Sequence, residues 1–110
     1  MTTIYHWCPA EAWDSAEDEY VAPSLDEEGF IHFSYRHQVA RTATALDRGR
    51  TDLVLLCVDP ANLEVVDEDC YDTGERYPHI YGPIPKVAVT EEVPFPPQAD
   101  GSFRLPSVLF

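Results

Sequence analysis

Three of the four histidines in this 110-residue sequence lie in short apolar stretches of the kind that form β-strands. They are His6 in IYHW, His32 in FIHFS and His79 in PHIY. Because side chains alternate between the two faces of a strand, His32 is expected to share a face with Phe30 and Ser34. On the same ground, His79 shares its face with Tyr81. The pattern predicts one cleft to which several strands contribute groups that can bind a ligand or move a proton.

Two other interpretations of these histidines stay open. A histidine inside a strand is often a hydrogen-bonded core residue without a further role. Three imidazoles could also hold a zinc ion with an open fourth position, although these three are far apart in sequence and form no ligand motif. No metal is therefore expected. The fourth histidine, His37, falls on a predicted helix and is expected at the surface.

The charge balance argues against two classes of partner. Twenty acidic and seven basic residues give a net charge of −13. Such a surface repels the phosphates of nucleic acids and anionic lipid headgroups, so neither is expected as a partner. A protein partner stays unassigned. The three cysteines form no CxxC pair and no metal-ligand spacing, which favours reduced thiols in a cytoplasmic protein.

Apolar periodicity predicts the elements that position the histidines. Strands are expected at residues 2–8, 30–34, 52–59, 63–68, 79–81 and 86–95. Helices are expected at 10–16, behind Pro9, and between Ser34 and Gly49. Residues 17–28 are expected to be an irregular, exposed acidic segment. The strand at 2–8 is apolar on both faces and is predicted to be central, the one at 52–59 to be buried, and the one at 63–68 to lie at an edge.

These elements predict one compact α+β domain. The length of 110 residues is typical of one domain, and no repeat or linker divides the chain. The domain is expected to span residues 1–110, with the motifs in residues 3 to about 93 and a tail at 94–110 packed on the surface. Trp7 and Trp13 are expected in the core. Cys8 shares a face with His6, but nothing nearby in the sequence would lower the pKa of its thiol.

Three segments together resemble the bacterial domain-of-unknown-function 952 family. They are IYHW, then YVAPSLDEEGFIHFS with Gln38 four residues further on, and PHIYGPIP. Glu68, ahead of the last segment, also fits the pattern of that family. The resemblance implies an ADP-ribosyltransferase-like fold, with two small, mostly antiparallel sheets and two N-terminal helices. Proteins of that fold bind NAD in a cleft between the sheets.

The resemblance also implies roles for individual residues. His6 matches the first motif of those enzymes and would hold a ribose of NAD, His32 matches the second and would line the nicotinamide pocket, and His79 matches the third. These three are the implied catalytic residues. The implied substrate-binding residues are Ser34, Tyr81, Gln38 and Glu68, with Arg36 and Arg76 for the phosphates because a guanidinium bonds two oxygens at once.

The third motif position departs from the usual pattern, which often has glutamate where this chain has His79. Cleavage of the nicotinamide–ribose bond builds positive charge on the sugar, and a carboxylate stabilises that charge. A neutral imidazole supplies none, and Glu68 is one substitute. ADP-ribosyl transfer or NAD glycohydrolysis is therefore one expectation. The alternative is a module that binds a small molecule or a protein without turnover.

Overall fold

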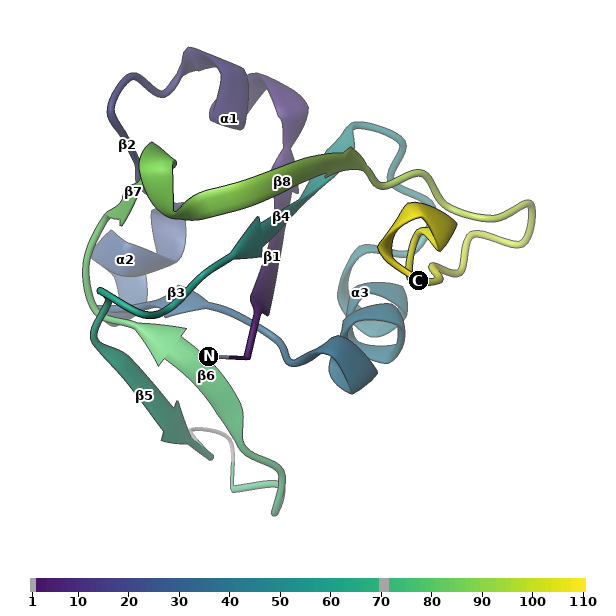
Figure 1. The fold of residues 1–110 in the computed structure, drawn as a ribbon. Helices are drawn as coiled ribbons and strands as arrows, with labels where there is room; N and C mark the ends of the chain where they lie inside the picture. The colour runs from purple at the N-terminus through teal and green to yellow at the C-terminus, as the bar shows by residue number, and fades with distance from the viewer. Residues whose placement is uncertain (1, 70–71) are drawn as a thin grey trace.

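The computed structural model describes residues 2–69 and 72–110. The strands of these residues form three small antiparallel sheets (Figure 1). The first sheet has the order β1–β4–β8, formed by Ile4–Pro9, Leu53–Val58 and Val89–Pro94. The second pairs β2 (Glu19–Tyr20) with β7 (Ile84–Pro85). The third has the order β3–β6–β5, formed by Ile31–His32, Tyr77–Ile80 and Val65–Glu68. The α+β class is confirmed, but two sheets were expected where these residues form three.

Three α-helices accompany the sheets in the described part of the chain. They are α1 (Ala10–Ser15), α2 (Pro23–Glu28) and α3 (Val39–Asp47). A 3₁₀ turn at Arg36–Gln38 leads into α3, and two more 3₁₀ turns lie at Lys86–Ala88 and Ser107–Leu109. None of these helices is long and apolar enough to cross a membrane.

The prediction of an irregular loop at 17–28 is wrong, because this segment contains both β2 and α2. Pro23 at the start of α2 suits the first helical turn, where a missing N–H costs nothing. Gly29 ends the helix with a φ of 90°, a conformation that favours glycine. The many carboxylates concealed the helix because α2 has no buried residue and so no apolar stripe.

β1 lies at the edge of its sheet and not at the centre, where it was expected. Its outer side is nevertheless hydrogen-bonded, because Tyr5 and Ser34 exchange two backbone bonds of 2.9 and 2.8 Å. This bridge joins the first sheet to the segment that follows β3. At Tyr5 both edges of β1 are therefore hydrogen-bonded, and four of its six residues are buried, which explains its apolar sequence.

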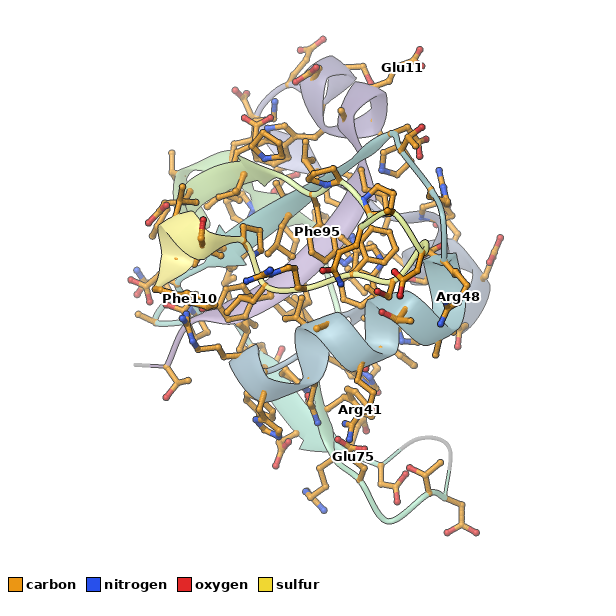
Figure 2. All side chains as sticks on the ribbon, turned by 90° about the vertical axis from the view of Figure 1, so that its right-hand side faces the viewer. Glu11, Arg41, Arg48, Glu75, Phe95 and Phe110 are labelled. Carbon is orange, nitrogen blue, oxygen red and sulfur yellow. The ribbon has the colours of Figure 1, made fainter. Side chains whose placement is uncertain are left out.

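Two groups of buried side chains pack on opposite faces of the central strand, β4. All six residues of β4 are buried, as predicted. Val54, Leu56 and Val58 belong to a cluster shared with the other two sheets. Leu53, Leu55 and Cys57 belong to a second cluster with Val39 and Ala43 of α3 and with Phe95 and Phe103. Figure 2 shows Phe95 above α3, in the middle of the molecule.

Candidate functional site

A cavity of about 730 Å³ lies where several elements meet. Its volume is in the range of small-molecule sites. β1 contributes His6 and Trp7, and the stretch around β3 contributes His32, Phe33 and Ser34. Further lining residues come from α3 with Arg41, Thr42 and Asp47, from the loop before β6 with Thr73 and Glu75, and from β6 with Tyr77 and His79. The structure thus brings four of the predicted site residues, His6, His32, Ser34 and His79, to one cavity.

His6 joins the cavity wall while both its ring nitrogens bond protein groups. Nδ1 lies 2.7 Å from the carbonyl oxygen of His32, and Nε2 lies 3.2 Å from the hydroxyl of Tyr20. A carbonyl can only accept, so Nδ1 carries the proton and Nε2 accepts from Tyr20. Burial lowers the pKa of His6 to about 4, so the ring is neutral at physiological pH. His6 therefore lines the cavity with both ring nitrogens bonded to protein groups, and its bond to His32 holds β1 to β3.

The thiol of Cys8 is buried in the core near these groups. Burial raises the pKa of this thiol to about 11. Cys57 is also buried, with its pKa raised to about 11 by burial, and both residues are free thiols. Cys70 lies outside the described residues. A buried thiol with a raised pKa is a poor nucleophile, so Cys8 is a core residue.

His32 and His79 face each other directly across the β3–β6 pair. Their ring centroids are 5.3 Å apart in an edge-on arrangement, and Phe30 stacks on His79 at 4.2 Å. His32 is partly exposed and its Nε2 is 2.9 Å from a carboxylate oxygen of Glu28. His79 is only 1% exposed. His32 and Phe30 were predicted to share a face, and their ring centroids lie 4.9 Å apart in an edge-on arrangement.

Glu68 lies behind His79 and is not among the lining residues. Its carboxylate accepts a bond of 3.0 Å from Nδ1 of His79 and another from the hydroxyl of Tyr81. In the bond to Glu68 the Nδ1–H of His79 is the donor, which orients the ring and turns Nε2 away from Glu68. Glu68 and Tyr81 were both predicted as site residues. Neither lines the cavity, and Glu68 connects them to it by its bond to His79.

The two arginines predicted to bind phosphates have protein partners elsewhere. Arg36 donates to the carbonyl oxygen of Leu109 at 2.7 Å and lies over the ring of Phe110, so it holds the C-terminal segment. Arg76 pairs with Asp67 of β5 at 3.0 Å. Neither residue lines the cavity, whereas Arg41 of α3 does.

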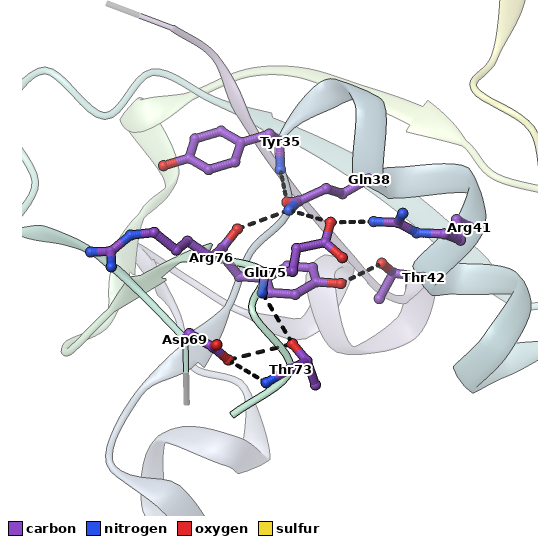
Figure 3. A network of polar contacts seen from close by, with 9 residues as sticks. Tyr35, Gln38, Arg41, Thr42, Asp69, Thr73, Glu75 and Arg76 are labelled. Atoms are coloured by element: carbon purple, nitrogen blue, oxygen red, sulfur yellow. Dashed lines mark hydrogen bonds and ion pairs between the residues drawn. The ribbon is translucent and has the colours of Figure 1, made fainter. Parts of the chain in front are cut away.

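Gln38 is buried behind the cavity wall and connects α3 to the loop before β6 (Figure 3). Its side-chain oxygen accepts from the backbone N–H of Tyr35 at 2.9 Å. Its amide nitrogen donates to Glu75 at 3.0 Å and to the carbonyl oxygen of Arg76 at 2.8 Å. Arg41 donates to the same carboxylate oxygen of Glu75. Gln38 was predicted to touch the substrate, and the structure places it one layer behind Glu75.

A family model for proteins of unknown function, named DUF952, matches residues 7–92. The chain belongs to the DUF952 family. Protein CC0527 from Caulobacter crescentus is similar over nearly its whole length. Its crystal structure has a TM-score of 0.85 at 33% identity, with 94% of this chain and 95% of that chain covered. Its solution NMR structure has a TM-score of 0.76 at 33% identity, with 93% and 91% covered. No curated protein matches the chain.

The DUF952 match contains all the described lining residues of the cavity except His6, which directly precedes it. Two of the segments on which the resemblance was based, FIHFS and PHIY, form the paired strands β3 and β6. The family assignment made from the sequence is therefore confirmed. The cavity is a feature of the region that defines this family.

Sequence reasoning missed several residues of the DUF952 cavity. Trp7 was assigned to the core, yet it is half-buried at the cavity and donates from its indole N–H to Asp47 at 2.8 Å. Thr42 and Tyr77 lie 3.4 Å apart through their hydroxyls. Leu46 of α3 also lines the cavity and is 71% exposed. A usable signal was the spacing of Arg41 and Thr42, three and four residues after Gln38, because residues at this spacing lie on one side of a helix.

The geometry does not support a three-histidine metal site. Among residues 2–69 and 72–110, no group of three His, Cys, Asp or Glu is arranged to hold a metal ion. His6 gives both ring nitrogens to protein partners, so the three imidazoles do not converge on one point.

Proposed function

We propose that this DUF952 protein binds NAD or a related nucleotide in the cavity, with the nicotinamide ribose against His32, Ser34 and His79. The observation that carries the proposal is the convergence of these three residues on a cavity of about 730 Å³. The resemblance to ADP-ribosyltransferase-like proteins, which bind NAD in a cleft between small sheets, gives these positions their assigned roles. We extend that superfamily relationship to this chain as part of the proposal.

The carboxylates of the cavity support a reaction at the nicotinamide–ribose bond. When that bond breaks, nicotinamide leaves with the electron pair and the ribose carbon becomes electron-deficient. Glu28 and Glu75 both line the cavity and could stabilise the positive charge that His79 cannot. Attack by water would give glycohydrolysis, and attack by another nucleophile would give ADP-ribosyl transfer.

Arg41 is the guanidinium that the described cavity wall offers to the phosphates. It lies on the exposed side of α3, with 61% of its side chain accessible. A guanidinium in this place can bond two phosphate oxygens at once while the nicotinamide end lies deeper. The proposal therefore assigns to Arg41 the role that the sequence suggested for Arg36 and Arg76.

Binding without turnover is a second candidate, and the engagement of the cavity carboxylates favours it. Glu28 accepts from His32, and Glu75 accepts from Gln38 and Arg41. A carboxylate that is already paired supplies less stabilisation to a developing charge than one reserved for it. The domain would then recognise the nucleotide and leave it intact.

Calorimetric titration of NAD into the purified protein tests the proposal. The protein is expected to show saturable binding. His32→Ala and Thr42→Val are expected to weaken it by about tenfold, since each removes a polar contact with the ligand. His37→Ala is the matched control, because His37 is exposed and does not line the cavity.

Thermal unfolding of each variant separates lost binding from lost folding. A nicotinamide-release assay on the same samples then distinguishes turnover from binding alone. No heat of binding at millimolar NAD with a folded wild-type protein would remove NAD from the cavity. Equal loss of affinity in His37→Ala would show that the effect does not arise there.

A further inference from the structure

We infer that Glu75 is the carboxylate that meets the positive charge of the ligand, so that the cavity selects the oxidised, cationic nicotinamide ring. The inference rests on the proposed binding of NAD and adds to it the residue that determines specificity. Glu75 lies outside the three motif segments that the sequence suggested, in the loop before β6.

Two donors hold one oxygen of Glu75 and leave the other available. Oε2 accepts from the amide of Gln38 at 3.0 Å and from the guanidinium of Arg41. Oε1 has no hydrogen bond among the residues that the structure describes. Because Glu75 lines the cavity, this second oxygen can accept a ligand without loss of the bonds that orient the carboxylate.

The group that positions Glu75 is itself rigidly held. Gln38 is 1% exposed and bonds the backbone of Tyr35 and of Arg76. The residues just before Glu75 are also held, since Asp69 accepts from the backbone N–H of Thr73 (Figure 3) and from that of Gly74. A preorganised carboxylate loses little freedom when it binds a charged partner.

The charge of Glu75 persists over the working range of pH. The hydrogen bond from Gln38 is the main cause that holds the pKa of Glu75 below its usual value, and the bond from Arg41 acts in the same direction. Three carboxylates, from Glu28, Asp47 and Glu75, line the cavity with the one guanidinium of Arg41 among its described residues. A cation is therefore favoured inside, and a phosphate is favoured only beside Arg41.

The other carboxylates are less suited to contact the ligand. Asp47 accepts the indole N–H of Trp7, and Glu28 bonds His32 from a side chain that is 44% exposed. Glu68 lies behind His79 and does not line the cavity. The aromatic rings of Trp7 and Tyr77 are part of the wall and add cation–π attraction for a positively charged ring.

Oxidised and reduced NAD provide a direct test, because the two differ in one hydride and in the charge of the nicotinamide ring. The wild-type protein is expected to bind the oxidised form about tenfold more tightly than the reduced form. Glu75→Gln keeps the size of the side chain and an oxygen for Gln38 and Arg41 but removes the charge. The variant is expected to bind oxidised NAD about tenfold more weakly than the wild type does. Its affinities for reduced NAD and for ADP-ribose are expected to be unchanged.

Glu11→Gln is the matched control, because Glu11 is an exposed carboxylate at the opposite end of the molecule from Glu75 (Figure 2). It is expected to behave as the wild type. Equal affinity of the wild type for oxidised and reduced NAD, or an unchanged preference in Glu75→Gln, would overturn the inference and leave NAD binding standing. Absence of binding for oxidised NAD, reduced NAD and ADP-ribose alike would overturn the proposed function and the inference together.

Discussion

At the scale of single residues, His6 shows that one strand histidine can serve both the fold and the site. Its Nδ1–H bonds the backbone of β3, and its Nε2 accepts from Tyr20 of β2, so the ring connects three sheets. The strand pattern indicated a polar group in an apolar context. It could not indicate that the partners were a carbonyl and a phenol, because these come from distant segments.

The ionisation of His6 predicts a loss of stability in mild acid. Burial lowers its pKa in the folded protein to about 4 from 6.5, so the unfolded chain binds the proton first as the pH falls. The stability that the folded protein gains by keeping His6 neutral is fully present above pH 6.5. It is lost progressively as the pH falls towards 4. The free energy of unfolding is expected to decrease by about 3 kcal/mol over this range from His6 alone.

Guanidinium unfolding of the wild type and of His6→Gln between about pH 7.5 and about pH 4.5 measures this effect. The variant is less stable throughout but lacks the titrating imidazole, so its stability is expected to vary less with pH. Identical pH dependence in the two proteins would contradict a buried neutral His6.

At the scale of elements, the pairing of β3 with β6 and the anchoring of α3 by Gln38 form the cavity. The short strands were predictable because FIHFS and PHIY alternate clearly. The two-residue strands β2 and β7 were not, because so few residues give no periodicity. Arg41 and Glu75 meet although 34 residues separate them, so no local pattern could have paired them.

Gln38→Ala is expected to destabilise the protein by about 2–3 kcal/mol, since it leaves the partly buried N–H of Tyr35 and the carbonyl of Arg76 without their Gln38 partner. It should also weaken binding of oxidised NAD, because Glu75 loses the donor that orients it. Gln98→Ala is the control, since Gln98 lies in an exposed turn and bonds only the nearby residue Ser102 through its amide. Urea unfolding of both variants gives the comparison, and equal losses would refute the role of Gln38.

At the scale of the whole molecule, the segment after β8 is part of the core. Phe95 and Phe103 pack with their ring centroids 4.8 Å apart on the face of β4 that α3 covers. The sequence predicted a tail packed on the surface, and its prolines and lack of periodicity gave no sign that Phe95 and Phe103 belong to a core cluster. The α+β class and the buried β4 were predictable, since the apolar run at 53–58 is strong and local.

Phe103→Ala is expected to lower the free energy of unfolding by about 3–5 kcal/mol. The substitution removes a ring that is 4% exposed and leaves a cavity under α3. Phe110→Ala is the control, as its ring is 77% exposed, and it should cost less than about 1 kcal/mol. Thermal unfolding by calorimetry distinguishes the two. Similar small losses in both variants would show that the C-terminal segment does not support the core.

The central claim is that the cavity between α3 and the β3–β6 pair binds NAD. The most direct measurement is an NMR titration of the labelled protein with oxidised NAD, followed through its backbone amides. The account predicts saturable shifts concentrated at His32, Ser34, Thr42, Glu75 and Tyr77, with Phe103 and Val108 unaffected. Absence of shifts at millimolar NAD, or shifts gathered around Val108 and Phe110, would contradict it.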